Sequence, residues 1–263
     1  MYNIMNSKFY EFVQKTILKF GNERGIEKMW KAPLMALVPA DHPQMTLLKQ
    51  VVCADHFLPE ELLEDAKSII AMFVPFEDRI AESNIEGETA SEDWAKAYVY
   101  TNELLNHVTA ETGTYLNEQG FRTFIIKATH NFFNEKTLLS RWSHRHIAWM
   151  AGLGTFGINN MLITEKGCCG RFSSFLTNAG CKELDLPVGN IKVSENCLNK
   201  RNGSCGLCQK KCPIKAYLKQ GSFDRHKCYE VCKKNAVCFK HIGLADVCGK
   251  CLAGLPCSSK APV

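Results

Sequence analysis

The sequence predicts an α+β fold with a small cysteine-rich part at its C-terminus, and three observations lead to this prediction. Helical and strand-like segments are interleaved over the first 190 residues, but too irregularly for a regular βαβ series. Eight of the fourteen cysteines form two ordered runs near the C-terminus. Residues 191–263 carry 14 Lys and Arg against 4 Asp and Glu, whereas residues 1–190 carry 18 against 23. We therefore expect two domains, 1–190 and 191–263, with the boundary near Pro187–Asn190.

The size and composition of the chain allow a substantial buried core. It has 263 residues, of which 46% are hydrophobic. No uninterrupted apolar stretch is long enough to cross a bilayer, and the best one, Ile69–Phe76, suits a buried strand. The N-terminus MYNIMNSKFYEF lacks the basic start and apolar run of a signal peptide. We therefore expect a cytoplasmic protein without a membrane partner.

Two elements are expected before residue 80. Apolar residues recur at helical spacing over residues 7–24, and glycines lie near the end of this segment. Pro59–Ala66 predicts a short helix that leads into a strand over Ser68–Pro75.

A long helix is expected over Ser91–Asn117, with Thr89-x-x-Glu92 as a candidate capping box. Gly120 ends this region, and the following FRTFIIKA predicts a strand over Phe121–Ala128. A further helix is expected near Trp142–Ala151, and the strand-like MLIT comes after it. The residues of the long helix that should face inward are Trp94, Tyr98, Leu105, Val108 and Leu116.

The cysteine spacing is typical of proteins with two iron–sulfur clusters. Bacterial two-cluster ferredoxins use a C-x2-C-x2-C-x3-C-P run whose last cysteine binds the other cluster. This chain departs from the pattern in a longer first gap and in five residues, ending with Pro256, before the last cysteine. The two runs are Cys197, Cys205, Cys208 and Cys212-Pro213, then Cys228, Cys248, Cys251 and Cys257.

The crossover of the last cysteine assigns the ligands to two [4Fe–4S] clusters. One set is Cys197, Cys205, Cys208 and Cys257, and the other is Cys212, Cys228, Cys248 and Cys251. Because the second run is irregular, Cys232 or Cys238 could replace Cys228 or Cys257. Such clusters transfer single electrons at low potential, so the pattern predicts a redox protein.

Other interpretations of these residues stay open. Two C-x2-C pairs could form a zinc ribbon, and thiols of a secreted chain could form disulfides. Zinc would leave Cys197, Cys212, Cys228 and Cys257 without a role. The positive charge of residues 191–263 could offset anionic clusters, or could form a face for an acidic redox partner or RNA.

A glycine-rich loop follows the last predicted helix. Gly152, Gly154 and Gly157 match G-x-G-x-x-G, the dinucleotide fingerprint. A dinucleotide loop leaves a strand and opens a helix, whereas here a helix precedes the glycines and a strand follows them. This order favours a tight turn in which only glycine tolerates a positive φ.

The wider context of this loop resembles the epoxyqueuosine reductase family, which is related to reductive dehalogenases. The residues that carry the resemblance are SHRHIAWMAGLGTFGINNMLIT (Ser143–Thr164), GRFSSFLTN (Gly170–Asn178) and the double cysteine run. AKSIIAMFVPF (Ala66–Phe76) and GFRTFIIKAT (Gly120–Thr129) also resemble core strands of that family. The resemblance extends from about Glu60 to the C-terminus.

This resemblance implies a nitroreductase-like α+β core that binds cobalamin, joined to a ferredoxin-like domain with two [4Fe–4S] clusters. It further implies a low-potential donor, such as ferredoxin or flavodoxin, whose electrons reach the cobalt through the clusters. The chain lacks a D-x-H-x-x-G run, so we expect base-off cobalamin. A flavin in the core is a further alternative. The residues expected to contact the cofactor are Gly152, Gly154, Thr155, Phe156, Gly157 and Asn159.

Two departures from the family change the expected function. Ile126 stands where the family has an aspartate thought to protonate the substrate, and Ile158 replaces the usual lysine of the glycine loop. We therefore expect a paralogue that acts on another substrate, either a small molecule or linked to RNA. The alternative is an electron carrier or reductive activator without substrate chemistry.

Another side chain would then have to supply the proton. His130 and His144 are the preferred candidates for this general acid, ahead of Tyr98, Lys127 and His146. Cys168-Cys169, in the loop after MLIT, could form a redox or substrate-contacting site or be inert buried thiols. The sequence does not identify the substrate or the oligomeric state.

Overall fold

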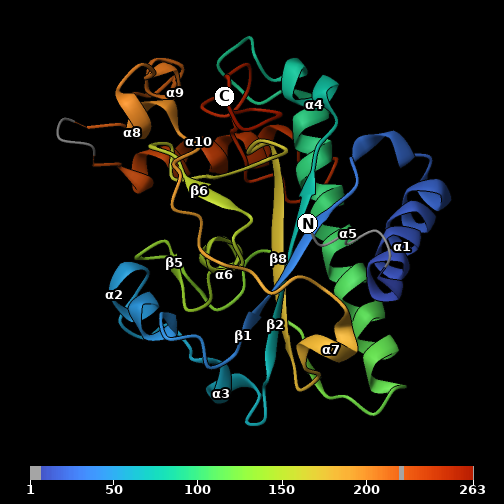
Figure 1. The fold of residues 1–263 in the computed structure, drawn as a ribbon. Coiled ribbons are helices and arrows are strands. Elements are labelled where there is room, and N and C mark those ends of the chain that lie inside the picture. The colour runs from blue at the N-terminus through green and yellow to red at the C-terminus, as the bar shows by residue number, and fades with distance from the viewer. Residues whose placement is uncertain (1–6, 219–221, 263) are drawn as a thin grey trace.

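The computed structural model describes residues 7–218 and 222–262, and a four-stranded antiparallel sheet in the order β1-β2-β8-β3 lies at its centre (Figure 1). Two short hairpins, β4–β5 and β6–β7, lie outside this sheet. The strands are β1 (Leu34–Pro39), β2 (Ser68–Pro75), β3 (Thr123–Phe124), β4 (Phe133–Asn134), β5 (Leu139–Ser140), β6 (Gly154–Phe156), β7 (Leu162–Thr164) and β8 (Gly170–Thr177).

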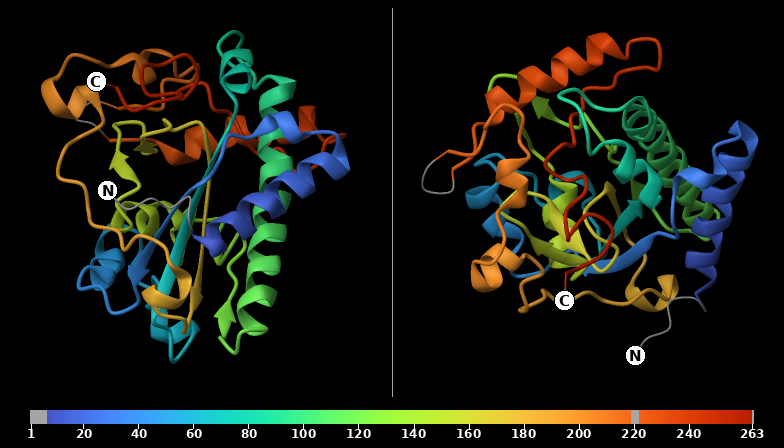
Figure 2. Two further views of the ribbon diagram at one scale, coloured as in Figure 1. Left: turned by 45° about the vertical axis from the view of Figure 1, so that its right-hand side comes forward. Right: turned by 90° about the horizontal axis from the view of Figure 1, so that it is seen from above.

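Helices cover both faces of the sheet, and three more lie in the C-terminal part (Figures 1 and 2). The α-helices are α1 (Lys8–Arg24), α2 (Leu48–Val51), α3 (Pro59–Leu62), α4 (Asp78–Ser83), α5 (Glu92–Asn117), α6 (His144–Met150), α7 (Cys181–Leu184), α8 (Leu198–Asn202), α9 (Leu207–Lys210) and α10 (Arg225–Cys238). Two 3₁₀ turns are η2 (Glu27–Met29) and η3 (Met45–Leu47). Interleaved helices and strands confirm the α+β prediction.

Strand β2 is buried on both faces, as its unbroken apolar sequence predicts. Ile70, Met72 and Val74 belong to the hydrophobic cluster that contains α1 and α5. Ile69 and Phe73 belong to a second cluster, which contains α6. Alternate side chains of one strand therefore hold the two helical layers together.

The long helix α5 has the predicted extent but a different cap. Ser91 is the N-cap, and its hydroxyl accepts a hydrogen bond from the backbone N–H of Trp94 at 3.1 Å. The predicted capping box from Thr89 to Glu92 is therefore wrong, because Ser91 lies directly before the first helical residue. The five residues expected to face inward are all buried.

The strand predicted over Phe121–Ala128 is too long, because only Thr123 and Phe124 pair with β8. The backbone N–H of Ala128 bonds to the side-chain oxygen of Asn106 on α5 at 3.0 Å, instead of to a neighbouring strand. Ile126 is 2% exposed and packs in the α6-side cluster. The strand-like apolar residues of this segment are thus partly explained by the packing of a loop. The helix and strand that flank the glycines, α6 and β7, lie where predicted.

The C-terminal part packs closely on the core at one end of the sheet (Figure 2). Just before the predicted boundary, the chain adds to the sheet edge, where the N–H of Gly189 bonds to the carbonyl of Leu37 at 2.8 Å. Beyond it, Cys197 and Leu252 belong to the same hydrophobic cluster as α1 and α5. Among the described residues, no helix has the length and apolar character needed to cross a membrane.

Candidate functional site

The four cysteines of the first predicted set line one cavity. Cys197 is the residue before α8, Cys205 lies just before α9, Cys208 lies on α9, and Cys257 comes from the C-terminal loop. Together with Asn159, Asn199 and apolar neighbours, they line this cavity, which is partly open to solvent. Burial and the neighbouring thiols, with Cys257 foremost, raise the pKa of Cys208 to about 11. Three separate segments therefore bring four thiols to one place.

The cysteines of the second set also lie near one another. Cys212 follows α9, Cys228 lies on α10, and Cys248 and Cys251 lie in the loop after α10. Burial, followed by the nearby thiols of Cys248, Cys228 and Cys212, raises the pKa of Cys251 to about 12. The sulfur of Cys212 accepts a hydrogen bond from the backbone N–H of Ala216 at 3.3 Å. The cysteines that the spacing assigns to each set thus lie near one another.

Each set has one additional thiol beside it. Cys168 is fully buried and contacts Cys257, and this contact raises the pKa of Cys257. Cys232 lies one helical turn after Cys228, and the hydrogen bond between the two raises the pKa of Cys232. Cys238 is exposed at the end of α10. Of the two substitutes that the sequence left open, Cys232 is thus the one beside a predicted ligand.

The described residues contain no group of three His, Cys, Asp or Glu side chains spaced to hold a single metal ion, and all fourteen cysteines are free thiols. A cubane cluster has different requirements, since each cysteine binds its own iron and the four sulfurs remain apart.

A buried cation lies between two cysteines of the second set. Lys250 is 3% exposed, and its ammonium group donates to the carbonyl oxygens of Asn84 at 3.2 Å and Glu86 at 2.5 Å. Within residues 7–218 and 222–262, no carboxylate forms an ion pair with it. A buried charge without a counter-charge is costly. An anionic cluster held by Cys248 and Cys251 would supply that counter-charge, so these residues fit the group.

The glycine loop forms the β6–β7 hairpin, and its glycines permit close backbone packing. A Cβ on Gly152, whose φ is +68°, would lie 2.2 Å from the carbonyl oxygen of Asn190. A Cβ on Gly154 would lie 2.3 Å from that of Ile163 on β7. Of the three glycines in the motif, only Gly152 has the positive φ that the tight-turn interpretation predicts, whereas Gly154 is needed for the close approach of β7.

The other residues predicted to bind cobalamin also contact the protein itself. The Thr155 hydroxyl accepts a hydrogen bond from the backbone N–H of Asn196 at 2.8 Å, and the Asn159 amide donates to the carbonyl of Cys251 at 3.4 Å. Gly157 is buried, whereas Phe156 is half-buried against the ring of His146, 4.7 Å between centroids. Through these contacts the hairpin supports the cysteine-rich part, while Asn159 also lines the cavity of the first set.

His144 is buried, and both of its ring nitrogens have partners. Nδ1 lies 2.7 Å from the hydroxyl of Ser174, and Nε2 lies 2.8 Å from the carbonyl oxygen of Lys127 and 2.8 Å from the amide of Asn131. Burial lowers the pKa of His144 to about 4. A neutral imidazole with these contacts orients the loop after β3 and has no proton available for a substrate.

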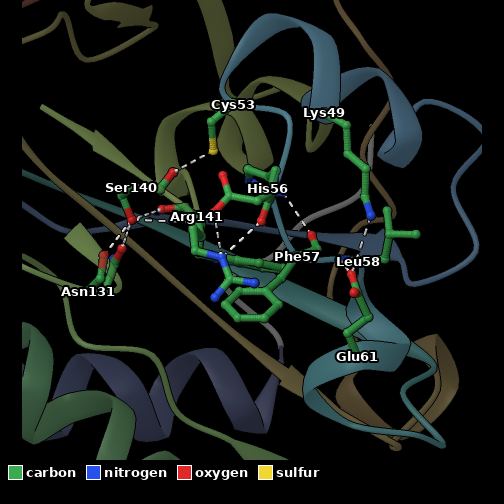
Figure 3. A network of polar contacts seen from close by, with 11 residues as sticks. Lys49, Cys53, His56, Phe57, Leu58, Glu61, Asn131, Ser140 and Arg141 are labelled. Carbon is green, nitrogen blue, oxygen red and sulfur yellow. Dashed lines mark hydrogen bonds and ion pairs between the residues drawn. The ribbon is translucent and has the colours of Figure 1, made fainter. Parts of the chain in front are cut away.

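Asn131, a partner of His144, also belongs to a polar network across the same loop (Figure 3). The hydroxyl of Ser140 bonds to Asn131, and the thiol of Cys53 donates to the carbonyl of Ser140 at 3.5 Å. Arg141 bonds to the Asp55 carboxylate at 3.0 Å, and its guanidinium lies 3.8 Å from the centre of the Phe57 ring. These contacts fix the loop to the segment between α2 and α3, which indicates a supporting role.

His130 has a different environment, at the junction between core and C-terminal part. Its Nε2 lies 3.2 Å from one carboxylate oxygen of Asp246, and the other oxygen accepts the Tyr98 hydroxyl at 2.8 Å. The hydrogen bond to Asp246 raises the pKa of His130. The Arg171 guanidinium lies 4.3 Å from the centre of the Tyr98 ring. This arrangement can hold and release a proton.

Sequence reasoning missed Asp246, although one signal was present: it is the only acidic residue after Glu230. Of the remaining proton-donor candidates, Tyr98 belongs to this arrangement, and burial lowers the pKa of His146 to about 4. Ile126 is apolar and buried.

No protein-family model matches the sequence, and no curated protein matches it by sequence. Solved structures, in contrast, share its fold. An epoxyqueuosine reductase from Bacillus subtilis, with its catalytic aspartate loop swung out of the active site, superposes with a TM-score of 0.54 at 16% identity, over 97% of this chain and 67% of that one. Another epoxyqueuosine reductase, in complex with an epoxyqueuosine-modified tRNA stem loop, superposes with a TM-score of 0.55 at 15% identity. The superposition covers 97% of this chain and 67% of that one.

A reductive dehalogenase whose structure suggests a mechanism for B12-dependent dehalogenation gives a TM-score of 0.56 at 15% identity, over 94% of this chain and 32% of that one. The chain thus spans about a third of the dehalogenase. It is a distant structural relative of these reductases. The predicted resemblance is confirmed at the level of the fold, and redox chemistry is the function that these relatives have in common.

Proposed function

We propose that the protein is an iron–sulfur oxidoreductase that accepts single electrons into two [4Fe–4S] clusters and delivers them to a reaction centre where the C-terminal part meets the core. The observation that supports this proposal is that Cys197, Cys205, Cys208 and Cys257 line one cavity, while Cys212, Cys228 and Cys248 lie near Cys251. The unpaired buried charge of Lys250 beside the second set gives independent support.

The ligands of one cluster would be Cys197, Cys205, Cys208 and Cys257, and those of the other Cys212, Cys228, Cys248 and Cys251. When bound, the clusters would supply reversible one-electron transfer at low potential. Tyr217 lies near the thiols of Cys208 and Cys251, one from each set. The two sets are therefore neighbours, and an electron could pass between them.

The proton for a reduction would come from His130, not His144. His144 is buried with both nitrogens engaged, whereas 37% of the His130 side chain is exposed and Asp246 favours its protonated form. Asp246 would orient the imidazolium, and Tyr98 holds the second carboxylate oxygen. General acid catalysis of this kind typically contributes about 10²–10⁴-fold to a rate.

Base-off cobalamin is the electron acceptor that we propose for this reaction centre, because a structural relative carries out B12-dependent chemistry. Thr155 and Asn159, two of the residues expected to contact it, also hold the C-terminal part through Asn196 and Cys251, so we assign no single residue to it. We further propose a substrate other than epoxyqueuosine, since the buried Ile126 cannot replace an acid.

Two observations favour a second function, that of a dedicated electron carrier or reductive activator. Ile126 is part of the hydrophobic core, and the β6–β7 hairpin is closed by its own contacts. In this function the clusters would pass electrons to another protein, and His130 would have only a structural role.

Anaerobic purification followed by iron, sulfide and corrinoid assays tests these proposals. We expect a brown protein with about eight iron and eight sulfide per chain. Stoichiometric zinc without sulfide would refute the cluster proposal. Failure of the reconstituted protein to bind cobalamin would favour the electron carrier. Restoration of queuosine in a strain that lacks the reductase would contradict our proposal of a different substrate.

A further inference from the structure

The two short helices that carry ligands of the first cysteine set form a basic face. Residues 196–223 contain six Lys and Arg and no Asp or Glu. Lys200 and Arg201 lie on α8, and Leu207 and Lys210 lie on α9; all four are exposed. We call these four residues the α8–α9 face. Figures 1 and 2 show the two helices together at one corner of the molecule, whereas α10 extends along another side.

The charges on this face lack partners within the molecule. In the part of the chain that the structure describes, neither Lys200, Arg201 nor Lys210 forms an ion pair with a carboxylate. On α10, Lys233 pairs with Glu230 at 2.6 Å, but Lys227 and Lys234 form no such pair among the described residues, so the position beside the first cysteine set, and not charge alone, distinguishes the α8–α9 face. An unpaired basic cluster attracts an acidic partner more strongly than one neutralised on its own surface.

The face lies directly over the first cysteine set. Cys197 is the residue before α8, and Cys208 is the residue after the exposed Leu207. The side chain of Asn199 bonds to the carbonyl of Cys205, which holds the two helices together. Because electron transfer slows steeply with distance, an external donor must dock where a cluster comes close to the surface. The second set lies near the proposed proton donor His130. Cys232 is an electrostatic neighbour of both Cys248 and Asp246, and Asp246 is the partner of His130.

We propose that the α8–α9 face is the docking surface for a small acidic protein that carries one electron at a time, and that electrons enter through the first cluster. This inference rests on the proposed iron–sulfur function. Leu207, 39% exposed, would provide a central apolar contact, and Lys200, Arg201 and Lys210 would pair with carboxylates of the donor. The docked donor loses one electron, which reduces the first cluster from its 2+ to its 1+ state.

An RNA could also bind a basic surface, but the geometry favours the protein donor. RNA linked to a substrate would have to reach the junction near His130 and Asp246. The α8–α9 face is instead adjacent to the first set of cysteines, where electrons and not substrates are needed. No aromatic side chain belongs to the face, so it offers no platform on which bases could stack.

The test compares two triple charge reversals in the full-length, cluster-loaded protein. One variant combines Lys200→Glu, Arg201→Glu and Lys210→Glu on the α8–α9 face. The control combines Lys227→Glu, Lys234→Glu and Lys240→Glu at exposed positions on and just after α10, with the same change in net charge. Iron content and the dithionite-reduced spectrum verify that each variant retains both clusters. Stopped-flow absorbance then measures cluster reduction by a reduced acidic flavodoxin.

We expect the α8–α9 variant to accept electrons from the flavodoxin about 10–10²-fold more slowly at low salt. The control should stay within about twofold of the wild type, whose rate should fall as salt screens the attraction. Equal slowing in both variants, or slowing in the control alone, would overturn the proposed surface. Selective loss of binding to a tRNA stem loop by the α8–α9 variant, with unchanged flavodoxin kinetics, would also overturn it and identify RNA as the ligand. Absence of iron from the wild type would refute the proposed function itself.

Discussion

The two cysteine sets share a spacing rule but have different surroundings. The first set lies under two short exposed helices and lines an open cavity. The second lies between α10 and the loop that follows it, with the buried Lys250 between two of its members. The first set therefore lies beside an exposed basic face, and the second has a buried cation beside it.

This difference suggests a direction for the electrons. A buried positive charge stabilises the reduced, more negative state of a neighbouring cluster and raises its reduction potential. Lys250 lies within the second C-x2-C pair, whereas the first pair encloses Gly206 and Leu207. We therefore expect the second cluster to have the higher potential, so that electrons move from the surface towards His130 and Asp246.

The largest expected effect is loss of a whole cluster. Cys208→Ser should lower the iron content from about eight to about four per chain, and so should Cys212→Ser. By the crossover assignment, the two variants should retain different clusters, although these cysteines are near neighbours in sequence. Electron paramagnetic resonance of the reduced proteins can show this, with Cys251→Ser as the matched control for Cys212→Ser. If Cys208→Ser and Cys212→Ser gave the same spectrum, the separation into two sets would be wrong.

A smaller effect is expected when the buried charge is removed. Lys250→Met should make the potential of the second cluster more negative and leave that of the first nearly unchanged. It should also cost about 1–3 kcal/mol of unfolding free energy, because the carbonyls of Asn84 and Glu86 lose their donor. A redox titration of the cluster signals and chemical unfolding measure the two effects. Lys240→Met, at an exposed position, is the control. If Lys250→Met and Lys240→Met shifted the reduction potentials of both clusters by the same amount, the two cluster environments would not differ as we describe.

The comparison also shows how far sequence reasoning reached. Local patterns sufficed for β2, α5 and α6, because each buries a regular stripe or an unbroken apolar run. Short loops likewise constrain the pairs Cys205–Cys208 and Cys248–Cys251 locally, whereas Cys257 reaches the first set from the C-terminal loop. The residual errors come from long-range contacts: Ile126 has strand-like neighbours in sequence but leaves the sheet to pack on α6.

Long-range contacts also decide which histidine has a proton to give. Nothing near His130 in sequence indicates a carboxylate partner, because Asp246 comes from the far end of the chain. Equally, nothing near His144 shows that Ser174 and Lys127 occupy both of its nitrogens. The role of each residue therefore depends on tertiary structure that the spacing of polar residues does not encode.

The smallest expected effect concerns the contact between His130 and Asp246, which joins the core to the part that holds the second set. The hydrogen bond to Asp246 raises the pKa of folded His130 above that of the unfolded chain. Its contribution to stability is therefore complete below the unfolded pKa of about 6.5 and is lost as the pH rises through the folded pKa. His130→Gln should consequently lower the melting temperature more at about pH 5.5 than at about pH 8.5.

Thermal unfolding of the wild type, His130→Gln and Asp246→Asn across this pH range measures the effect. The two variants should show similar losses, and the double variant should lose little more, because each single change already breaks the same contact. His226→Gln, at an exposed position on α10, is the control and should follow the wild type. A loss that stays constant with pH would mean that His130 is not protonated by its contact with Asp246. The second cluster would then lack the neighbouring proton source that distinguishes it from the first.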